Sequence, residues 1–175
     1  MSMRARAKAD LSTTLFDVLA DVRVGMLGPA MDEGHMQPMT HFADKAHSRL
    51  WFITSAKTNL ARGMREDGQK RLHHCVVSPD QDFYACLTGI ARINTDPAQL
   101  KTLWSPMVAA WFPGGREDPD VTLIELPLTE ASVWTVSDSA LVLGVEMGRS
   151  LLQKDHLPDV GDHMTLRFDG ASATV

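Results

Sequence analysis

The sequence predicts a mostly antiparallel α+β fold or a closed β architecture, and three observations lead to this fold class. Six or more short segments are rich in β-branched and aromatic residues, which favour strands. Turn residues separate several of these segments at the spacing of hairpins. Only three or four segments have the apolar period of a helix. A mostly antiparallel sheet follows, because hairpins join neighbouring strands in opposite directions.

The length and composition indicate one folded domain. The chain has 175 residues, of which 44% are apolar and 22% are charged, as in ordinary globular proteins. That length is enough to bury a core without disulfide bonds or metals. Residues 1–10 alternate basic and small side chains and lack the apolar stretch of a secretory signal. We therefore expect a flexible N-terminal tail over residues 1–10 and a single domain over residues 11–175.

The net charge and the cysteine content indicate which binding partners and which cellular compartment to expect. The net charge is −5 and no dense basic block occurs, which disfavours binding to nucleic acid. No apolar run is long enough to span a bilayer, so we expect no membrane contact. Cys75 and Cys86 fall in segments predicted as neighbouring strands, but two cysteines are too few for a disulfide framework. The sequence therefore indicates a soluble, cytoplasmic protein with reduced thiols.

The N-terminal part is predicted to form a helix and a hairpin. One apolar face indicates a helix over residues 11–22. Residues 24–27 and 35–42 are predicted as strands joined by a turn at residues 32–34. Pro38 cannot donate a ladder hydrogen bond, so it belongs at a sheet edge or a bulge. Backbone groups beside it would be free to meet a ligand; the alternative is a proline that only protects the edge.

A strand that passes into a helix forms the most informative stretch. A buried strand over residues 50–53 runs into Thr54 and Ser55, then Lys57, and a helix follows with Thr58 as its candidate N-cap. Hydroxyls, free N–H groups, the helix dipole and a cation would together suit a phosphate. The alternative is that the hydroxyls only cap the helix and the lysine is solvated. On local sequence alone the alternative is favoured, because capping hydroxyls are common.

The second half is predicted to contain further strands and one long helix. Residues 73–78 and 83–94 are predicted as strands, the longer one with a bulge at Gly89. A helix is predicted over residues 96–111, with Pro97 at its first position. The remaining predicted elements are strands over residues 121–128 and 131–136, a short helix over residues 145–152 and a last strand over residues 164–168.

Two tryptophans lie on the apolar stripe of the long predicted helix. Trp104 and Trp111 are followed by Phe112-Pro113-Gly114-Gly115, which places flat aromatic surface beside a flexible turn. Tryptophans on such a stripe most often belong to the core. The alternatives are that they cover a planar heterocycle or form a subunit interface.

Seven histidines raise the question of a metal, but their spacing does not support one. His73, His74 and Cys75 are adjacent in a predicted strand, where successive side chains point to opposite faces. No paired-ligand motif occurs, nor any HExxH, GxSxG or Walker sequence. We therefore expect no metal, and the sequence identifies no catalytic residue.

Three motifs resemble those of a known family. They are Gly34-His35-Met36-Gln37-Pro38-Met39-Thr40, then Leu50-Trp51-Phe52-Ile53-Thr54-Ser55-Ala56-Lys57-Thr58, then Leu103-Trp104-Ser105-Pro106 with Ala110-Trp111-Phe112-Pro113-Gly114-Gly115. In this order they resemble the general stress protein branch of the pyridoxamine 5'-phosphate oxidase-like flavoproteins. The similarity runs from about residue 15 to residue 134, and loosely to residue 168. The tryptophan segment is its most specific part.

The resemblance implies a fold, a cofactor and a set of contacts. The family's fold is a six-stranded antiparallel split β-barrel with flanking helices, which forms a homodimer and binds FMN at the subunit interface. By position, the phosphate would be held by Thr54, Ser55, Lys57 and Thr58. The flavin would lie along the backbone of Gln37, Pro38, Met39 and Thr40. The partner chain would contribute Trp104 and Trp111.

The chain departs from the family pattern at two cationic positions. Gln37 stands where many split-barrel flavoproteins have arginine, and Leu60 stands where many have lysine. The arginine and histidine set with which the oxidase binds its own substrate near the C-terminus is not evident, so the resemblance does not extend to vitamin B6 oxidation. It implies an FMN-dependent oxidoreductase tied to stress response. The alternative is a non-enzymatic dimer that binds a deazaflavin, no cofactor, or haem through His41 or His73.

Overall fold

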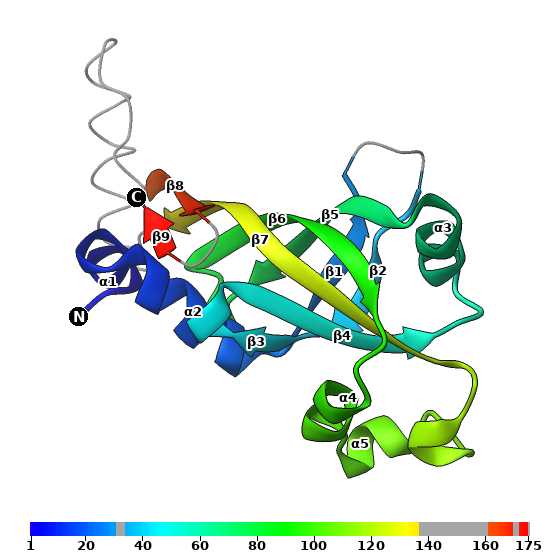
Figure 1. The fold of residues 1–175 in the computed structure, drawn as a ribbon. Coiled ribbons are helices and arrows are strands. Elements are labelled where there is room, and N and C mark those ends of the chain that lie inside the picture. Colours follow the sequence, from blue (N-terminus) through cyan, green and yellow to red (C-terminus); the bar gives the residue numbers. More distant parts are fainter. Residues whose placement is uncertain (31–33, 137–160, 170–171, 175) are drawn as a thin grey trace, which may run out of the picture.

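The computed structural model describes residues 1–30, 34–136, 161–169 and 172–174, which are coloured in Figure 1. Their strands form one antiparallel sheet that curls into a half-barrel flanked by helices. The order is β2-β1-β5-β6-β7-β4-β3, and β8 pairs with β7 and β9. The predicted split-barrel class is therefore confirmed, although the described residues form nine strands instead of six.

The elements have the following bounds. The strands are β1 (Val24–Pro29), β2 (Gln37–Thr40), β3 (Phe42–Asp44), β4 (Arg49–Ser55), β5 (Gln69–Val77), β6 (Phe83–Asn94), β7 (Val121–Val136), β8 (Gly161–Asp169) and β9 (Ser172–Thr174). The helices are α1 (Met3–Ala9), α2 (Leu11–Val22), α3 (Asn59–Asp67), α4 (Pro97–Leu103) and α5 (Pro106–Ala109), with 3-10 turns η1 (Lys45–His47) and η2 (Gly115–Glu117).

Helix α2 has the bounds that the sequence predicted. The side chain of Asp10 accepts a hydrogen bond from the N–H of Thr13 at 2.8 Å, which caps the first turn. The helix ends at Arg23, whose left-handed backbone (φ 59°) stops further helical bonds. Its buried face includes Leu15 and Leu19, as the apolar spacing predicted.

The N-terminal residues form helix α1, where the sequence predicted a flexible tail. Ser2 caps this helix, and Ala7 is buried. Arg4 forms an ion pair with Asp162 on β8, and Lys8 reaches the same carboxylate. The partner that orders this segment therefore comes from the other end of the chain, so the local sequence gave no sign of it (Figure 1).

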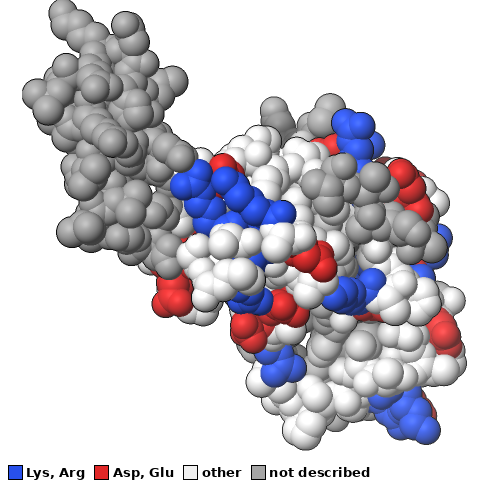
Figure 2. All heavy atoms as spheres, turned by 90° about the vertical axis from the view of Figure 1, so that its left-hand side faces the viewer, with Lys and Arg blue, Asp and Glu red and all other residues white. Residues whose placement is uncertain are grey.

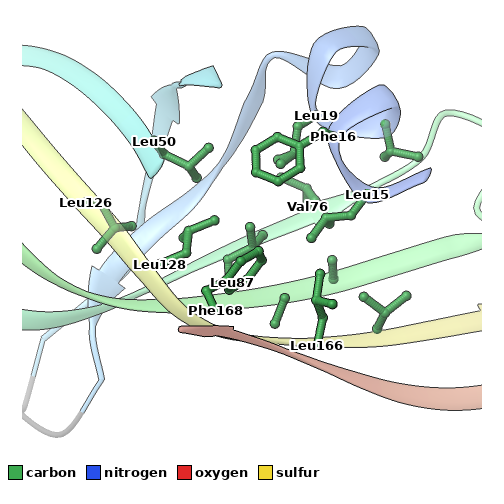
Figure 3. Close-up of a cluster of buried hydrophobic side chains, with 14 of the residues drawn as sticks. Leu15, Phe16, Leu19, Leu50, Val76, Leu87, Leu126, Leu128, Leu166 and Phe168 are labelled. Atoms are coloured by element: carbon green, nitrogen blue, oxygen red, sulfur yellow. The ribbon is translucent and has the colours of Figure 1, made fainter. Parts of the chain in front are cut away.

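The core lies between α2 and the concave side of the sheet. Figure 3 shows Leu15, Phe16 and Leu19 of α2 with side chains from several strands. The labelled strand residues are Leu50, Val76, Leu87, Leu126, Leu128, Leu166 and Phe168. Phe16 and Phe168 meet edge to face, with ring centroids 6.5 Å apart.

The predicted helix over residues 96–111 was wrong, because two short helices occupy this segment. Helix α4 ends at Leu103, and Trp104 is extended (φ −70°, ψ 127°). Ser105 then caps α5, and Pro106 takes its first position. A proline inside a continuous helix would lose one hydrogen bond and clash with the preceding turn. The tryptophans therefore lie on two separate pieces of chain.

The two strands predicted over residues 121–128 and 131–136 are one long strand, β7. Its pairing with β6 changes register at Gly89, because Thr88 lies opposite Glu130 and Gly89 lies opposite Leu128. Thr129 is the extra residue, and its hydroxyl donates to the carbonyl of Thr88 at 3.1 Å. The irregularity predicted at Gly89 is confirmed.

Two predicted elements lie wholly or partly outside the described residues. They are the short helix over residues 145–152 and the turn at residues 32–34, of which only Gly34 is described. Within the described part of the chain, no helix is long and apolar enough to cross a membrane. Figure 2 views the face that carries the chain ends, where basic and acidic side chains lie next to each other.

Candidate functional site

The corner between β4 and α3 is built by hydroxyl side chains that stabilise the helix start. The hydroxyl of Thr58 donates to the carbonyl of Ser55 at 2.9 Å and accepts from the N–H of Ala61 at 3.2 Å. Thr58 is therefore the N-cap that the sequence predicted. The N–H groups of Asn59 and Leu60 stand in the first turn, where a helix supplies no partner of its own. They face outward from a helix N-terminus, which favours an anion.

Lys57 extends from this corner but is paired with an acid. Its ammonium group forms an ion pair with Asp120, in the loop that precedes β7. The Lys57 side chain is 79% exposed, so solvent screens the pair. The hydrogen bond and the charge of Asp120 raise the pKa of Lys57. Any anion at the corner would therefore compete with Asp120 for this cation.

Ser55 and Thr54 lie at different depths. The half-buried Ser55 accepts a hydrogen bond from the N–H of Lys57 at 3.2 Å, and its own O–H donates to no group among the described residues. Thr54 is buried and lies opposite Thr122 of β7, whose hydroxyl accepts from Arg65 at 3.2 Å. The exposed corner thus consists of Ser55, Lys57 and Thr58, whereas Thr54 lies beneath it.

Strand β2 carries the four residues that the resemblance assigned to the flavin. It is the edge strand next to β1, and its alternation leaves Gln37 and Met39 half-buried and Pro38 and Thr40 exposed. Met39 packs against the core, and the amide of Gln37 donates to its sulfur at 3.7 Å. The edge position predicted for the proline is therefore confirmed.

The ladder also shows which backbone groups of β2 point to the open edge. The N–H of His41 donates to the carbonyl of Arg23 at 2.9 Å, which makes these two residues a hydrogen-bonded pair. Such pairs alternate with non-hydrogen-bonded ones along an antiparallel ladder. Pro38 and Thr40 therefore occupy positions whose backbone groups point away from β1. The missing N–H of Pro38 costs the sheet nothing, and the N–H of Thr40 faces outward.

The two tryptophans of the α4–α5 segment differ in environment. Trp104 is half-buried, and its ring lies 6.0 Å from that of the buried Phe112 in the same chain. Trp111 is 80% exposed, and Met107 on the same segment is 69% exposed. In Figure 1 this segment and α3 both lie toward the end of the molecule away from the chain termini. Trp111 is therefore the tryptophan of the pair that is mostly exposed.

A buried carboxylate near this end of the sheet was not identified from the sequence. Glu125 on β7 is 1% exposed and lies between Arg49 of β4 and Arg92 of β6. It accepts hydrogen bonds from both arginines and, at 3.1 Å, from Asn94. Burial alone would raise the pKa of Glu125, but the hydrogen bonds from Arg92 and Asn94 and the nearby cations lower it overall. The available signal was an acid between the apolar residues Ile124 and Leu126.

Trp51 is a second residue whose role was missed. It lies opposite Glu125, is 5% exposed, and has the Arg49 guanidinium 5.7 Å from its ring centroid. Its indole N–H is buried and has no hydrogen-bond partner among the described residues. By strand alternation Trp51 and Ser55 point to the same face of β4. An unpaired buried donor on that face is suited to an acceptor atom of a ligand.

The histidines considered as haem ligands occupy different environments. His41 is buried, with Nε2 bonded to the carbonyl of Leu19 at 2.8 Å and Nδ1 bonded to His74 at 2.9 Å. Neither nitrogen of His41 is free to bind iron. His73 is half-buried and lines an outer-face hollow of about 490 Å³ together with Cys86 and Trp134. Among the described residues, no cluster of three His, Cys, Asp or Glu side chains could hold a metal ion.

Comparisons with known proteins agree with this architecture. The family model described as pyridoxamine 5'-phosphate oxidase like matches residues 10–159. A structure from Jannaschia sp. CCS1, assigned provisionally as a general stress protein 26, is 32% identical, covers 91% of this chain and 99% of its own, and has a TM-score of 0.71. The general stress FMN/FAD binding protein from Xanthomonas citri is 32% identical, covers 73% and 89%, and has a TM-score of 0.65.

A more distant structure supports the fold alone. The general stress protein 26 from Bacillus anthracis is 18% identical and has a TM-score of 0.60, with 70% of this chain and 92% of that chain covered. A comparison with curated proteins found no match. The family match spans most of the chain and agrees with the curled antiparallel sheet and the strand–helix corner. The chain therefore belongs to the pyridoxamine 5'-phosphate oxidase-like family.

Proposed function

We propose that this protein is a cytoplasmic, homodimeric flavoprotein that binds FMN at the β4–α3 corner and serves as a stress-related oxidoreductase. The observation that carries the proposal is the exposed anion-binding geometry of the corner, in a chain 32% identical to a general stress FMN/FAD binding protein. FMN has a phosphate at one end and a flat ring at the other, so the site must suit both.

The corner suits the phosphate of FMN. The hydroxyl proton of Ser55 has no acceptor within the described part of the chain, and the first-turn N–H groups of α3 point outward beside it. Lys57 supplies a cation once the phosphate displaces Asp120. The hydroxyl of Thr58 already has a donor and an acceptor, so we assign Thr58 to holding the helix start. Thr54 is buried in β4 beneath the corner, so we assign it to supporting the residues that hold the phosphate.

The ring of FMN is assigned to the edge strand and its surroundings. The outward N–H of Thr40 can donate to a ring oxygen or nitrogen, and the carbonyl of Pro38 can accept from a ring N–H. Gln37 and Met39 support the strand from its inner side. The unpaired indole N–H of Trp51 offers a further donor. FMN, when bound, supplies the electron and hydride transfer, while these residues bind and orient it.

The homodimer is supported by the apolar surface of the α4–α5 segment. Trp111 and Met107 are large, apolar and mostly exposed in one chain, which is typical of an interface. We assign Trp111 to the contact with the partner subunit. Trp104 is packed on Phe112 of its own chain, so we assign it to supporting that contact.

FMN binding is tested by titrating the purified protein and following quenching of flavin fluorescence. We expect saturable binding to the parent protein. The substitution Lys57→Ala should weaken it by about tenfold, because it removes one charge-assisted phosphate contact. Mass spectrometry of the compound released on denaturation separates FMN from a deazaflavin.

Lys45→Ala is the matched control, because Lys45 is an exposed lysine that contacts Thr13 at 2.9 Å, away from the corner. It should bind FMN as the parent does. Equal affinity of Lys57→Ala and Lys45→Ala would remove Lys57 from the phosphate site. No saturable binding to the parent protein would overturn the flavin proposal itself.

A further inference from the structure

Two free thiols face each other across neighbouring strands. Cys75 on β5 lies directly opposite Cys86 on β6, and neither is in a disulfide. Both are half-buried, while the adjoining Val76 and Leu87 are buried in the core. Because side chains alternate along a strand, the two cysteines share the outer face of the sheet.

The position of the pair within the ladder brings the side chains close. At the end of this hairpin the N–H of Ser78 donates to the carbonyl of Phe83 at 2.9 Å, so these two residues form a hydrogen-bonded pair. The register is unbroken from there to the cysteines, and hydrogen-bonded and non-hydrogen-bonded pairs alternate. Cys75 and Cys86 therefore form a non-hydrogen-bonded pair, with Cα atoms about 4.5 Å apart. Disulfides bridge Cα separations of about 4.4–6.8 Å.

The surroundings leave the pair open to a small reagent. The thiols lie in an apolar hollow of about 350 Å³, together with Val77, Tyr84 and Trp134. The interaction between the two facing thiols lowers the pKa of Cys75 and raises the pKa of Cys86. Cys75 is thus the thiol that forms the nucleophilic thiolate more readily.

We propose that Cys75 and Cys86 form a reversible intrachain disulfide when the protein meets hydrogen peroxide. The Cys75 thiolate attacks one peroxide oxygen, the O–O bond breaks, and a sulfenic acid and hydroxide form. The Cys86 sulfur then attacks the sulfur of Cys75, and water leaves. In total two thiols lose two electrons and two protons, and one peroxide becomes two waters. The inference does not depend on flavin binding.

The test is to treat the full-length protein with hydrogen peroxide, quench it, and count the thiols that react with iodoacetamide. We expect both thiols to be lost and the intact mass to fall by two hydrogen atoms. Proteolysis should yield one cross-linked peptide that contains both cysteines, and a thiol reductant should restore the parent mass. Cys75→Ser and Cys86→Ser should each abolish the cross-link.

A diagonal pair is the matched control for the geometry. The double variant Cys86→Ser with Thr88→Cys keeps two thiols on the same strands, but at diagonal positions with Cα atoms about 7–8 Å apart. We expect it to form the cross-link at least tenfold more slowly than the parent. An equal rate in the two proteins would overturn the inference. So would two alkylatable thiols after saturating peroxide, a disulfide between chains, or oxidation of Cys75 to a sulfinic acid without a disulfide.

Discussion

His41 and His74 form a buried pair whose protons are fixed by a single acceptor. The carbonyl of Leu19 can only accept, so the Nε2 of His41 must carry its proton. The Nδ1 of His41 is then bare and accepts from the Nε2–H of His74. This leaves the Nδ1 of His74 buried without a partner among the described residues. Both rings are therefore neutral, because a second proton on either ring would have no acceptor among these groups.

This pair predicts that the protein loses stability in mild acid. Burial, and then the neighbouring His41, lower the pKa of His74 to about 3, and burial lowers the pKa of His41. In the unfolded chain both would titrate near pH 6.5, so below that value the unfolded state binds more protons. The free energy of unfolding should fall by up to about 1.4 kcal/mol per histidine for each pH unit below 6.5. Urea unfolding on both sides of this pH measures the slope.

Two variants separate this effect from general acid sensitivity. His74→Phe fills the space beside Phe52 and should flatten the slope between about pH 6.5 and pH 5, where carboxylates contribute little. His47→Gln removes an exposed histidine that pairs with Asp44, and this variant should keep the parent slope. A parent slope that persists in His74→Phe would show that the buried pair is not responsible.

For single residues, roles that depend on neighbours in the sequence could be predicted, whereas contacts between residues far apart in the chain could not. Thr58 as a cap and Pro38 at an edge follow from what each side chain can donate or accept within a few residues. Lys57 with Asp120, and Glu125 with its arginines, join residues far apart in the chain. Their partners are set by strand pairing, which no local pattern encodes.

Two glycines in different elements predict opposite effects of the same substitution. Gly63 lies inside α3, where the contact of an added methyl group with the described residues would be with the Lys70 Nζ, at 3.7 Å. Gly63→Ala should stabilise the protein by about 0.5–1 kcal/mol, because alanine has less freedom to lose in a helix. At Gly89 in β6 the methyl group would lie 2.1 Å from the carbonyl oxygen of Pro127. Gly89→Ala should cost about 1–3 kcal/mol or more.

Thermal and urea unfolding of the two variants under the same conditions measure both changes, and each serves as the control for the other. Stabilisation by Gly89→Ala would mean that β6 and β7 do not approach closely at the bulge. Destabilisation by Gly63→Ala would mean that α3 is not helical at its centre.

Elements were predicted well where caps and periodicity agreed and poorly where they conflicted. Helix α2 has a capping acid, one apolar face and no internal proline, so its bounds were correct. The segment of α4 and α5 has a helical apolar stripe, but it also has Ser105 and Pro106 in its middle. The helix ends there in spite of the apolar stripe. A continuous helix would lose a backbone hydrogen bond at Pro106, and that loss costs more free energy than the apolar spacing gains.

For the whole molecule, the antiparallel class followed from hairpin spacing, whereas the strand order did not. Strand β7 pairs with β4, β6 and β8, and nothing in its own sequence indicates these three neighbours. The split-barrel arrangement was predicted only through the resemblance of three motifs to a known family. The ion pair of Arg4 with Asp162, which joins the two ends of the chain, was likewise invisible locally.

The proposed dimer gives a prediction at this scale. Trp111 is 80% exposed in one chain, so Trp111→Ala should change monomer stability by less than about 0.5 kcal/mol. If a partner covers this ring, the same change should weaken the dimer by about 2 kcal/mol, roughly 30-fold in the dissociation constant. Sedimentation equilibrium over a range of concentrations measures it.

Trp134→Ala is the comparison, because Trp134 is also exposed but lies on β7, stacked on His163. It should leave the dimer intact. If Trp134→Ala weakened the dimer and Trp111→Ala did not, the interface would lie on the outer face of the sheet. A parent protein that is monomeric at all concentrations would refute the dimer.

The extra residue at Thr129 has a consequence for the shape of the barrel. Before it, β7 turns Leu126 and Leu128 inward, and after it, Ala131 and Val133. Leu128 and Ala131 are three residues apart, whereas inward side chains of a regular strand are two apart. Deleting Thr129 would therefore restore regular alternation along β7 and keep every one of these side chains inward. The ladder with β6 would also become continuous. The surplus length on one side, which bends the strand, would disappear together with the hydrogen bond from Thr129 to Thr88. An exposed threonine outside both core and ladder thus controls the curvature of the sheet and, with it, the width of the barrel interior.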